Sequence, residues 1–170
     1  MRGPGRAWFG ALTMVLNVAG TLLIIVMALA VNADVIGRDL FDQPIAGVTE
    51  FLGLAIVAVV FLQMANTLRE DRHIANDLIM AWVARRHVRT ACAFYGLFHV
   101  IGGALMALIV WYVLPILVEN YEGGYYKGTG GIVEIPVWPF LAVVVLGAAV
   151  SAIQYLLHAW REFRGVTAAR

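Results

Sequence analysis

Residues Glu50 to Arg69 read EFLGLAIVAVVFLQMANTLR. The 18 residues between the two charged ends carry no ionisable side chain. At about 1.5 Å of rise per residue, a helix of this length crosses nearly the whole hydrocarbon core of a bilayer. Charged residues gather on both sides, with Arg38 and Asp39 before the stretch and Glu70 to His73 after it. The stretch therefore predicts a membrane-spanning helix, around which the other spans are arranged.

The composition of the whole chain supports the same fold class. Of the 170 residues, 62% are hydrophobic and only 14% are charged. A soluble domain of this size still has a large surface and cannot hide so much apolar area. The apolar residues fall into four runs, about 8–31, 48–68, 90–118 and 138–158. We therefore predict an all-α integral membrane protein in which residues 1–170 form one domain with four transmembrane helices.

The first apolar run could also be a signal peptide. Its basic start, with Arg2 and Arg6, and its end at Val31-Asn-Ala33 resemble the features around a cleavage site. However, the run is longer than the usual apolar region of a signal peptide. Thr13, Asn17 and Thr21 also share one helix face, which suits packing on a partner helix. A retained transmembrane helix is the favoured interpretation.

The distribution of Lys and Arg predicts the orientation. The N-terminal tail, the 69–89 loop and the C-terminal tail hold two, five and three of these residues. The 32–47 and 119–137 loops hold one each. Cytoplasmic loops carry the excess of positive charge. We therefore expect both termini and the 69–89 loop to be cytoplasmic.

The 69–89 loop contains a candidate amphipathic helix over about residues 72–86. Its apolar positions follow helical spacing: Ile74, Leu78, Ile79, Trp82 and Val83. A basic cluster follows at Arg85, Arg86 and Arg89. This pattern favours a helix lying in the cytoplasmic interface. The alternative is that the second span simply continues beyond the lipid.

The four histidines raise the possibility of haem, because a membrane four-helix bundle can hold haem between two axial imidazoles. Counted from Arg89, His99 lies about 15 Å inside the third span. Counted from Arg161, His158 lies only about 5 Å deep. No pair is therefore expected to share a level, and His99 is better explained by a hydrogen bond between helices. No cofactor and no metal ligand set is predicted.

Glu50, at the entrance of the second span, has two explanations. Ionisable groups within a membrane are candidates for binding an ion or a proton. Near the start of a helix, however, a carboxylate also complements the positive end of the helix dipole. Arg38 could pair with it across the first loop. We favour the structural ion pair and expect Glu50→Ala to lower stability or assembly.

The chain has none of the motifs expected of an enzyme or of a complete transporter. It lacks paired carboxylates within a span, a phosphate-binding loop, HExxH and CxxC. No span is interrupted at its middle as in substrate-binding transporter helices. Two pairs of small residues four positions apart suit close helix packing: Gly103 with Ala107, and Gly147 with Ser151. An accessory, non-enzymatic membrane subunit is the better prediction.

Several short motifs resemble one known family. They are Arg38 and Phe41 after the first span, then Pro44, Gly47 and Glu50, then His73-Ile-Ala-Asn-Asp77, and finally Ile135-Pro-Val-Trp138. In this order and spacing, the sequence resembles the small membrane subunit, of DctQ type, of tripartite ATP-independent periplasmic (TRAP) transporters. The resemblance covers nearly the whole chain.

The resemblance implies a subunit of a three-part system in the bacterial cytoplasmic membrane. A periplasmic solute-binding protein captures the solute, usually an organic acid. A large membrane subunit of DctM type moves it with a cation gradient, usually sodium. The small subunit serves as a scaffold or stator, and its candidate assembly residues are Arg38, Glu50, His73, Asp77, Trp82 and Trp138. The alternatives are the membrane anchor of a haem-containing respiratory complex and a free-standing small transporter.

Overall fold

The computed structural model describes residues 4–69, 88–128 and 133–168, and this part of the chain is almost entirely helical. It contains α1 (Pro4–Phe41), α2 (Val48–Arg69), α4 (Val88–Glu122) and α5 (Trp138–Ala168). The strands β1 (Tyr126–Lys127) and β2 (Ile135–Pro136) form a short antiparallel hairpin. Each of the four helices is long and apolar enough to span a membrane. The predicted all-α membrane fold with four transmembrane helices is confirmed.

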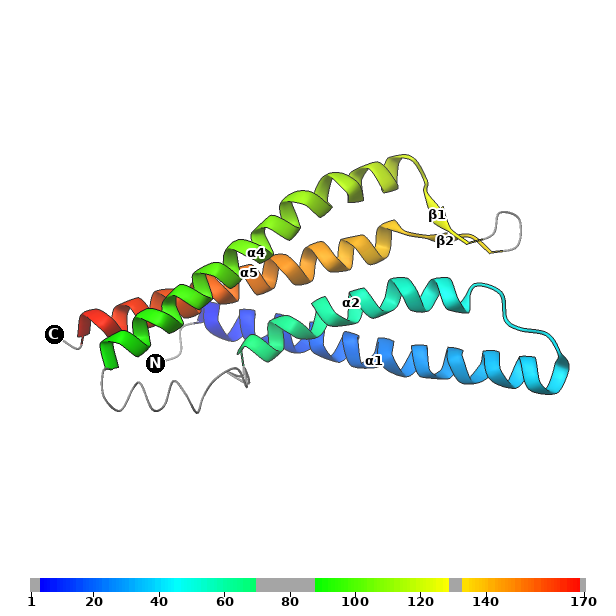
Figure 1. Ribbon diagram of the computed structural model, residues 1–170, viewed down its shortest axis with the longest axis horizontal. Coiled ribbons are helices and arrows are strands. Elements are labelled where there is room, and N and C mark those ends of the chain that lie inside the picture. Colours follow the sequence, from blue (N-terminus) through cyan, green and yellow to red (C-terminus); the bar gives the residue numbers. More distant parts are fainter. Residues whose placement is uncertain (1–3, 70–87, 129–132, 169–170) are drawn as a thin grey trace.

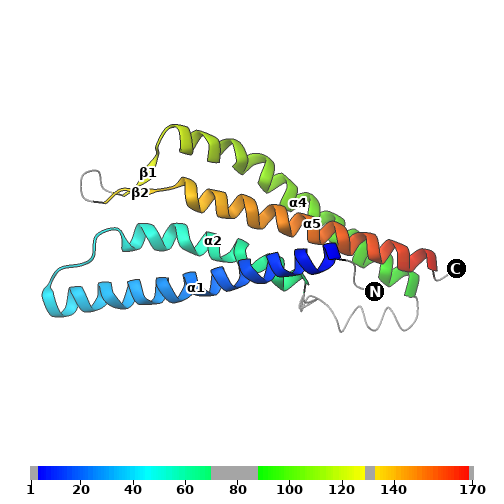
Figure 2. The same cartoon turned by 180° about the vertical axis from the view of Figure 1, so that it is seen from behind.

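The helices are arranged in a row rather than around a central axis. α1 packs on α2, α2 on α5, and α5 on α4. This order places α1 and α4 at the two edges and α2 and α5 in the middle (Figure 1). The start of α1 and the end of α5 point to one end of the bundle, here called the terminal end. The α1–α2 connection and the β1–β2 hairpin lie at the other, the hairpin end (Figure 2).

Two of the helices, α1 and α5, extend well beyond the predicted spans. α1 continues from Val31 to Phe41, and α5 continues from His158 to Ala168. The sequence analysis treated the first charged residues as helix ends, whereas these helices continue through them. α1 has 38 residues and is therefore about 57 Å long, far more than the thickness of the hydrocarbon core. α2 agrees with its predicted span to within one residue, and α4 runs through Pro115 to Glu122.

The end of α1 is set by local backbone chemistry. Asp42 adopts a positive φ of 52°, a conformation that Asp tolerates better than most residues. Its amide donates to the Arg38 carbonyl, and the Gln43 amide donates to the Gly37 carbonyl. Pro44 follows, which cannot continue a helix because it has no amide hydrogen. The chain then turns at Gly47, with φ 88°, into α2.

Each contact between neighbouring helices includes a glycine at which the next helix leaves no room for a β-carbon. A β-carbon at Gly20 would lie 2.9 Å from Gln63 Cγ, where α1 meets α2. At Gly147 it would lie 2.5 Å from the Phe61 carbonyl oxygen, where α5 meets α2. At Gly102 it would lie 2.7 Å from the Tyr155 ring, where α4 meets α5. Small residues let helix backbones approach closely in membranes. The main hydrophobic core, with Leu16, Leu62 and Val150, lies nearby between α1, α2 and α5.

Candidate functional sites at the two ends of the bundle

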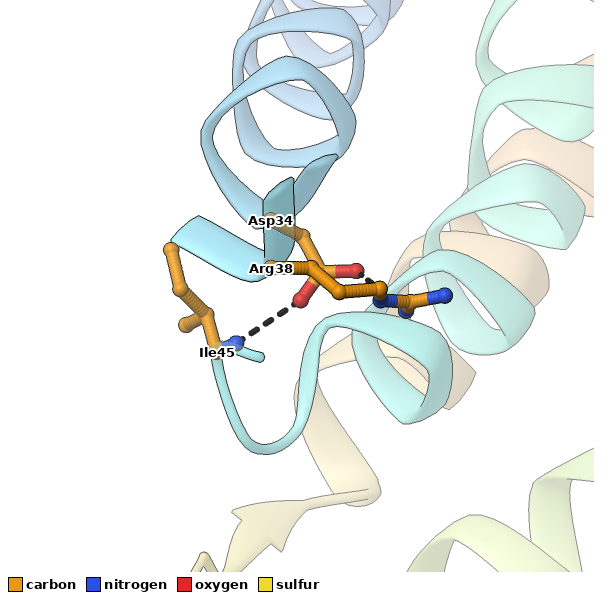
Figure 3. Close-up of polar contacts among 3 residues, drawn as sticks. All are labelled: Asp34, Arg38 and Ile45. Atoms are coloured by element: carbon orange, nitrogen blue, oxygen red, sulfur yellow. Dashed lines mark hydrogen bonds and ion pairs between the residues drawn. The ribbon is translucent and has the colours of Figure 1, made fainter. Parts of the chain in front are cut away.

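At the hairpin end, Asp34 connects the last turns of α1 to the loop that follows. Its Oδ1 accepts a hydrogen bond of 2.7 Å from the Ile45 amide. Its Oδ2 lies 3.0 Å from Arg38 Nη2, one helical turn later (Figure 3). The Asp34 side chain is only 15% exposed, against 63% for Arg38. One carboxylate thus fixes both the helix end and the path of the loop, and Asp34 was missed as a candidate because it was assigned to the loop.

The expected ion pair between Arg38 and Glu50 is not formed. Both residues are described, and the ion pair of Arg38 is with Asp34. The i, i+4 spacing on a continuous helix brings these two side chains together without any constraint from the loop. Glu50 lies in the first turn of α2, where its charge complements the positive end of that helix. The structural role of Glu50 and the effect of its loss stay predictions.

Aromatic contacts close the hairpin end on the other side of the row. Trp138 begins α5, and its ring packs edge-on against Tyr121 near the end of α4, with ring centroids 5.5 Å apart. Phe51 of α2 packs in the same way on Phe140 of α5, at 6.1 Å. A β-carbon at Gly47 would clash with the Val133 side chain, which places the α1–α2 loop against the hairpin segment. The contact between Trp138 and Tyr121 joins the start of α5 to the end of α4.

The predicted separation of His99 and His158 is wrong. Their ring centroids lie 5.3 Å apart, and the His99 ring also contacts Tyr155 at 6.0 Å. The depth of His158 was counted from Arg161, whereas α5 continues to Ala168. Within the described helices, His99 lies 11 residues after Val88 and His158 lies 10 residues before Ala168. The two imidazoles therefore share a level on antiparallel helices.

This shared level does not make a haem site. A porphyrin held by both imidazoles must insert between them, and hence between α4 and α5. At this position the two helices are in direct contact, with Gly102 against the Tyr155 ring and Gly103 against Leu156. The packing leaves no slot for a planar macrocycle. The arrangement of these residues does not fit haem.

The remaining candidate residues lie outside the described part of the chain. These are His73, Asp77 and Trp82, together with the proposed interfacial helix at about residues 72–86. Their roles in assembly stay predictions. We also expect Leu78→Ser combined with Trp82→Ser, on the apolar face of that helix, to weaken a complex with a membrane partner.

The largest surface feature is the apolar exterior of the edge helices. In the most apolar 18-residue stretch of α4, 6% of the residues are buried, and in that of α1, 11% are buried. The exposed side chains include Leu22, Ile25, Leu29 and Ile36 on α1, and Leu97, Ile101, Leu105 and Leu108 on α4. These surfaces require lipid or another membrane protein to cover them.

Taken together, these features define a multi-pass membrane protein with apolar edges. Among the residues that the structure describes, no three His, Cys, Asp or Glu side chains gather in one place. The comparison with known families is specific: residues 27–165 match the family model described as the DctQ component of tripartite ATP-independent periplasmic transporters. The chain belongs to this family of transporter components.

The predicted family membership is thereby confirmed, and the matched region covers all of α2 and α4, most of α5 and the C-terminal part of α1. The same comparisons find no match to a curated protein or to a solved structure.

Proposed function

We propose that this chain is the small membrane subunit of a TRAP-type secondary active transporter for organic acids. It acts as a fixed scaffold for a large membrane subunit of DctM type, which works with a periplasmic solute-binding protein and a sodium gradient. The observation that best supports this role is the row of helices with two long apolar edges. Such a row presents a broad lateral surface to a membrane partner.

The distribution of charge supports a scaffold rather than a pathway. The central segments of all four helices carry no Asp, Glu, Lys or Arg, from Gly10 to Ala33, Phe51 to Leu68, Thr90 to Val118 and Trp138 to Trp160. We expect a pathway for a carboxylate solute to carry basic groups such as Lys or Arg within the membrane. We therefore assign solute recognition to the partner subunits and mechanical support to this chain.

We place the chain in the bacterial cytoplasmic membrane with both termini in the cytoplasm. The positive-inside rule supports this orientation, because ten of the twelve Lys and Arg residues lie in the two tails and the 69–89 loop. The hairpin end then faces the periplasm. It carries an acidic set of Asp34, Asp39, Asp42, Glu119, Glu122 and Glu134, against Arg38 and Lys127.

The proposed role is tested by purifying the tagged chain from its native membrane in mild detergent and identifying what accompanies it by mass spectrometry. We expect a large polytopic membrane protein at equal stoichiometry. Uptake of the solute in liposomes should then require both membrane subunits and the binding protein. Redox subunits in place of that partner, or uptake by this chain alone, would contradict the proposal.

Bulky substitutions on the two edges locate the contact. Leu29 of α1 is 65% exposed and Leu108 of α4 is 52% exposed. Lipid adapts to a tryptophan at either position, but a close helix contact does not. We expect the substitution on the edge that binds the large subunit, either Leu29→Trp or Leu108→Trp, to lower co-purification of that subunit at least about tenfold. The other substitution is the matched control, and both should leave the thermal unfolding of the isolated chain unchanged. Full co-purification of both variants would exclude the edges as the contact.

A further inference from the structure

The contact between His99 and His158 brings together two potential metal ligands on different helices. Two imidazoles that each bind one tetrahedral ion through a single nitrogen, at about 2.0–2.1 Å, have their ring centroids about 5 Å apart. The observed separation is 5.3 Å, with the ring planes inclined by 45°. The observed centroid separation matches the one expected for two ligands of one ion.

The surroundings hold the two rings in place. His158 is only 8% exposed, and Gln154, one turn before it on α5, is 4% exposed. The His99 ring packs on Tyr155, whose own ring lies against the backbone of α4 at Gly102. A ligand pair fixed by packing loses little conformational freedom when it binds an ion.

We propose that His99 and His158 bind a divalent transition-metal ion, of the Zn²⁺ or Ni²⁺ class, that fastens α4 to α5. Imidazole nitrogen favours these ions, whereas Mg²⁺ and Ca²⁺ favour carboxylate and carbonyl oxygens. Binding displaces any proton that the coordinating nitrogens carry or share. The consequence is mechanical, because α4 is an edge helix that packs extensively only on α5.

The ligand count defines what kind of site this is. Within the described ranges, no third His, Cys, Asp or Glu side chain joins the pair. Structural zinc sites instead use four protein ligands. The pair is therefore an exchangeable site of moderate affinity.

The test uses the full-length chain in detergent, purified without a polyhistidine tag and stripped of metal with a chelator. Co²⁺ serves as the probe, because its visible absorption reports tetrahedral coordination, and Zn²⁺ is added in thermal unfolding. We expect one Co²⁺ per chain, with a Kd below about 100 μM. Saturating Zn²⁺ should raise the Tm by mass action.

Matched variants connect the binding to these two residues. His99→Gln and His158→Gln should each weaken Co²⁺ binding at least about tenfold. The control is the double variant His73→Gln with His87→Gln, which removes two imidazoles and should leave Co²⁺ binding unchanged. His158→Cys supplies a different ligand, so it should retain the ion with a shifted absorption spectrum.

Three results would overturn the proposal: no saturable binding in the wild-type chain, full binding in both glutamine variants, or loss of binding in the loop-histidine control. Tm measurements without metal show whether each variant is folded. Where a glutamine variant fails to fold, the cysteine variant decides, because an unshifted Co²⁺ spectrum would mean that residue 158 does not ligate.

Discussion

α4 and α5 pack against each other and are both strongly apolar, yet they differ in how they are used. In the most apolar 18-residue stretch of each helix, 39% of the residues of α5 are buried but only 6% of those of α4. The buried set on α5 is rich in small and polar side chains: Gly147, Ala148, Ser151, Ala152, Gln154, His158 and Ala159. The exposed set on α4 is made of large apolar ones. On this pair of helices, small and polar side chains of α5 are buried, whereas large apolar side chains of α4 are exposed.

The physical reason is the solvent. Lipid is as apolar as leucine, so large apolar side chains gain little by leaving it. Close packing between backbones gains more, and it requires side chains that do not hold the helices apart. α5 lies between α2 and α4 and meets both at glycine contacts, at Gly147 and Gly102. The comparison therefore predicts that added side-chain atoms lower the stability of the protein most when they lie on the inner helix, α5.

The largest effect is expected from Gly147→Ala on α5. The new β-carbon would meet the Phe61 backbone of α2 at 2.5 Å, and backbone atoms cannot move aside without displacing the helix. We expect the free energy of unfolding to fall by about 2–3 kcal/mol. The measurement is SDS titration of the purified chain in mixed micelles.

Gly53→Ala on α2 is the matched control for that substitution. The nearest atom to its new β-carbon is Lys127 Nζ at 3.9 Å, which is ordinary contact distance. Its stability should stay within about 0.5 kcal/mol of wild type. Equal losses at the two positions would mean that close packing does not distinguish the inner contact.

A second prediction extends the comparison to α1, the other edge helix. Asp34→Ala removes the acceptor of the Ile45 amide and the partner of Arg38, and should destabilise the hairpin end by about 1–2 kcal/mol. Arg38→Ala removes only an exposed ion pair and should cost less than about 1 kcal/mol. Amide hydrogen exchange at residues 42–47 measures both. If Arg38→Ala opens the loop as much as Asp34→Ala, the ion pair rather than the amide contact holds this edge.

A third prediction compares the two contacts that α5 makes. Gly102→Ala on α4 places its β-carbon 2.7 Å from the Tyr155 ring, a side chain that can rotate. The loss of stability should be about 1 kcal/mol, clearly below that of Gly147→Ala. Gly102→Ala combined with Tyr155→Leu should recover most of the loss. A double variant no more stable than Gly102→Ala would place the strain in the backbone here too.

The sequence was sufficient to predict the number and type of helices, since four long apolar runs admit few other structures. It was also sufficient for the family, through short motifs such as Ile135 to Trp138. It was insufficient for helix ends, because Asp34 and Arg38 form an ion pair within a helix that continues to Phe41. The same error separated His99 from His158, since depths were counted from charged residues rather than from helix ends.

The neighbours of each helix could not be predicted either. The four runs are apolar on all sides, so periodicity does not show which face is buried. The small-residue pairs were the available signal and were only partly informative. Gly103, Gly147 and Ser151 are buried, whereas Ala107 is exposed. The row α1–α2–α5–α4 depends on long-range packing that spacing within one helix does not encode.

The smallest expected effect has the opposite sign and concerns Ser151 on α5. Its side chain is fully buried, and its Oγ has no hydrogen-bond partner among the described residues. A buried hydroxyl without a partner costs free energy, whereas a methyl group at the same position does not. We therefore expect Ser151→Ala to leave stability unchanged or to raise it by about 0.5–1 kcal/mol in the same SDS titration.

Thr13→Ala is the matched control on α1, because Thr13 is equally buried but donates to the Gly10 carbonyl, and it should lower stability. Since the Ser151 hydroxyl has no hydrogen-bond partner among the described residues, removing it should not weaken the bundle. A loss above about 0.5 kcal/mol in Ser151→Ala would show that the hydroxyl contributes to packing, and the comparison between α4 and α5 would then need a polar term as well as a steric one.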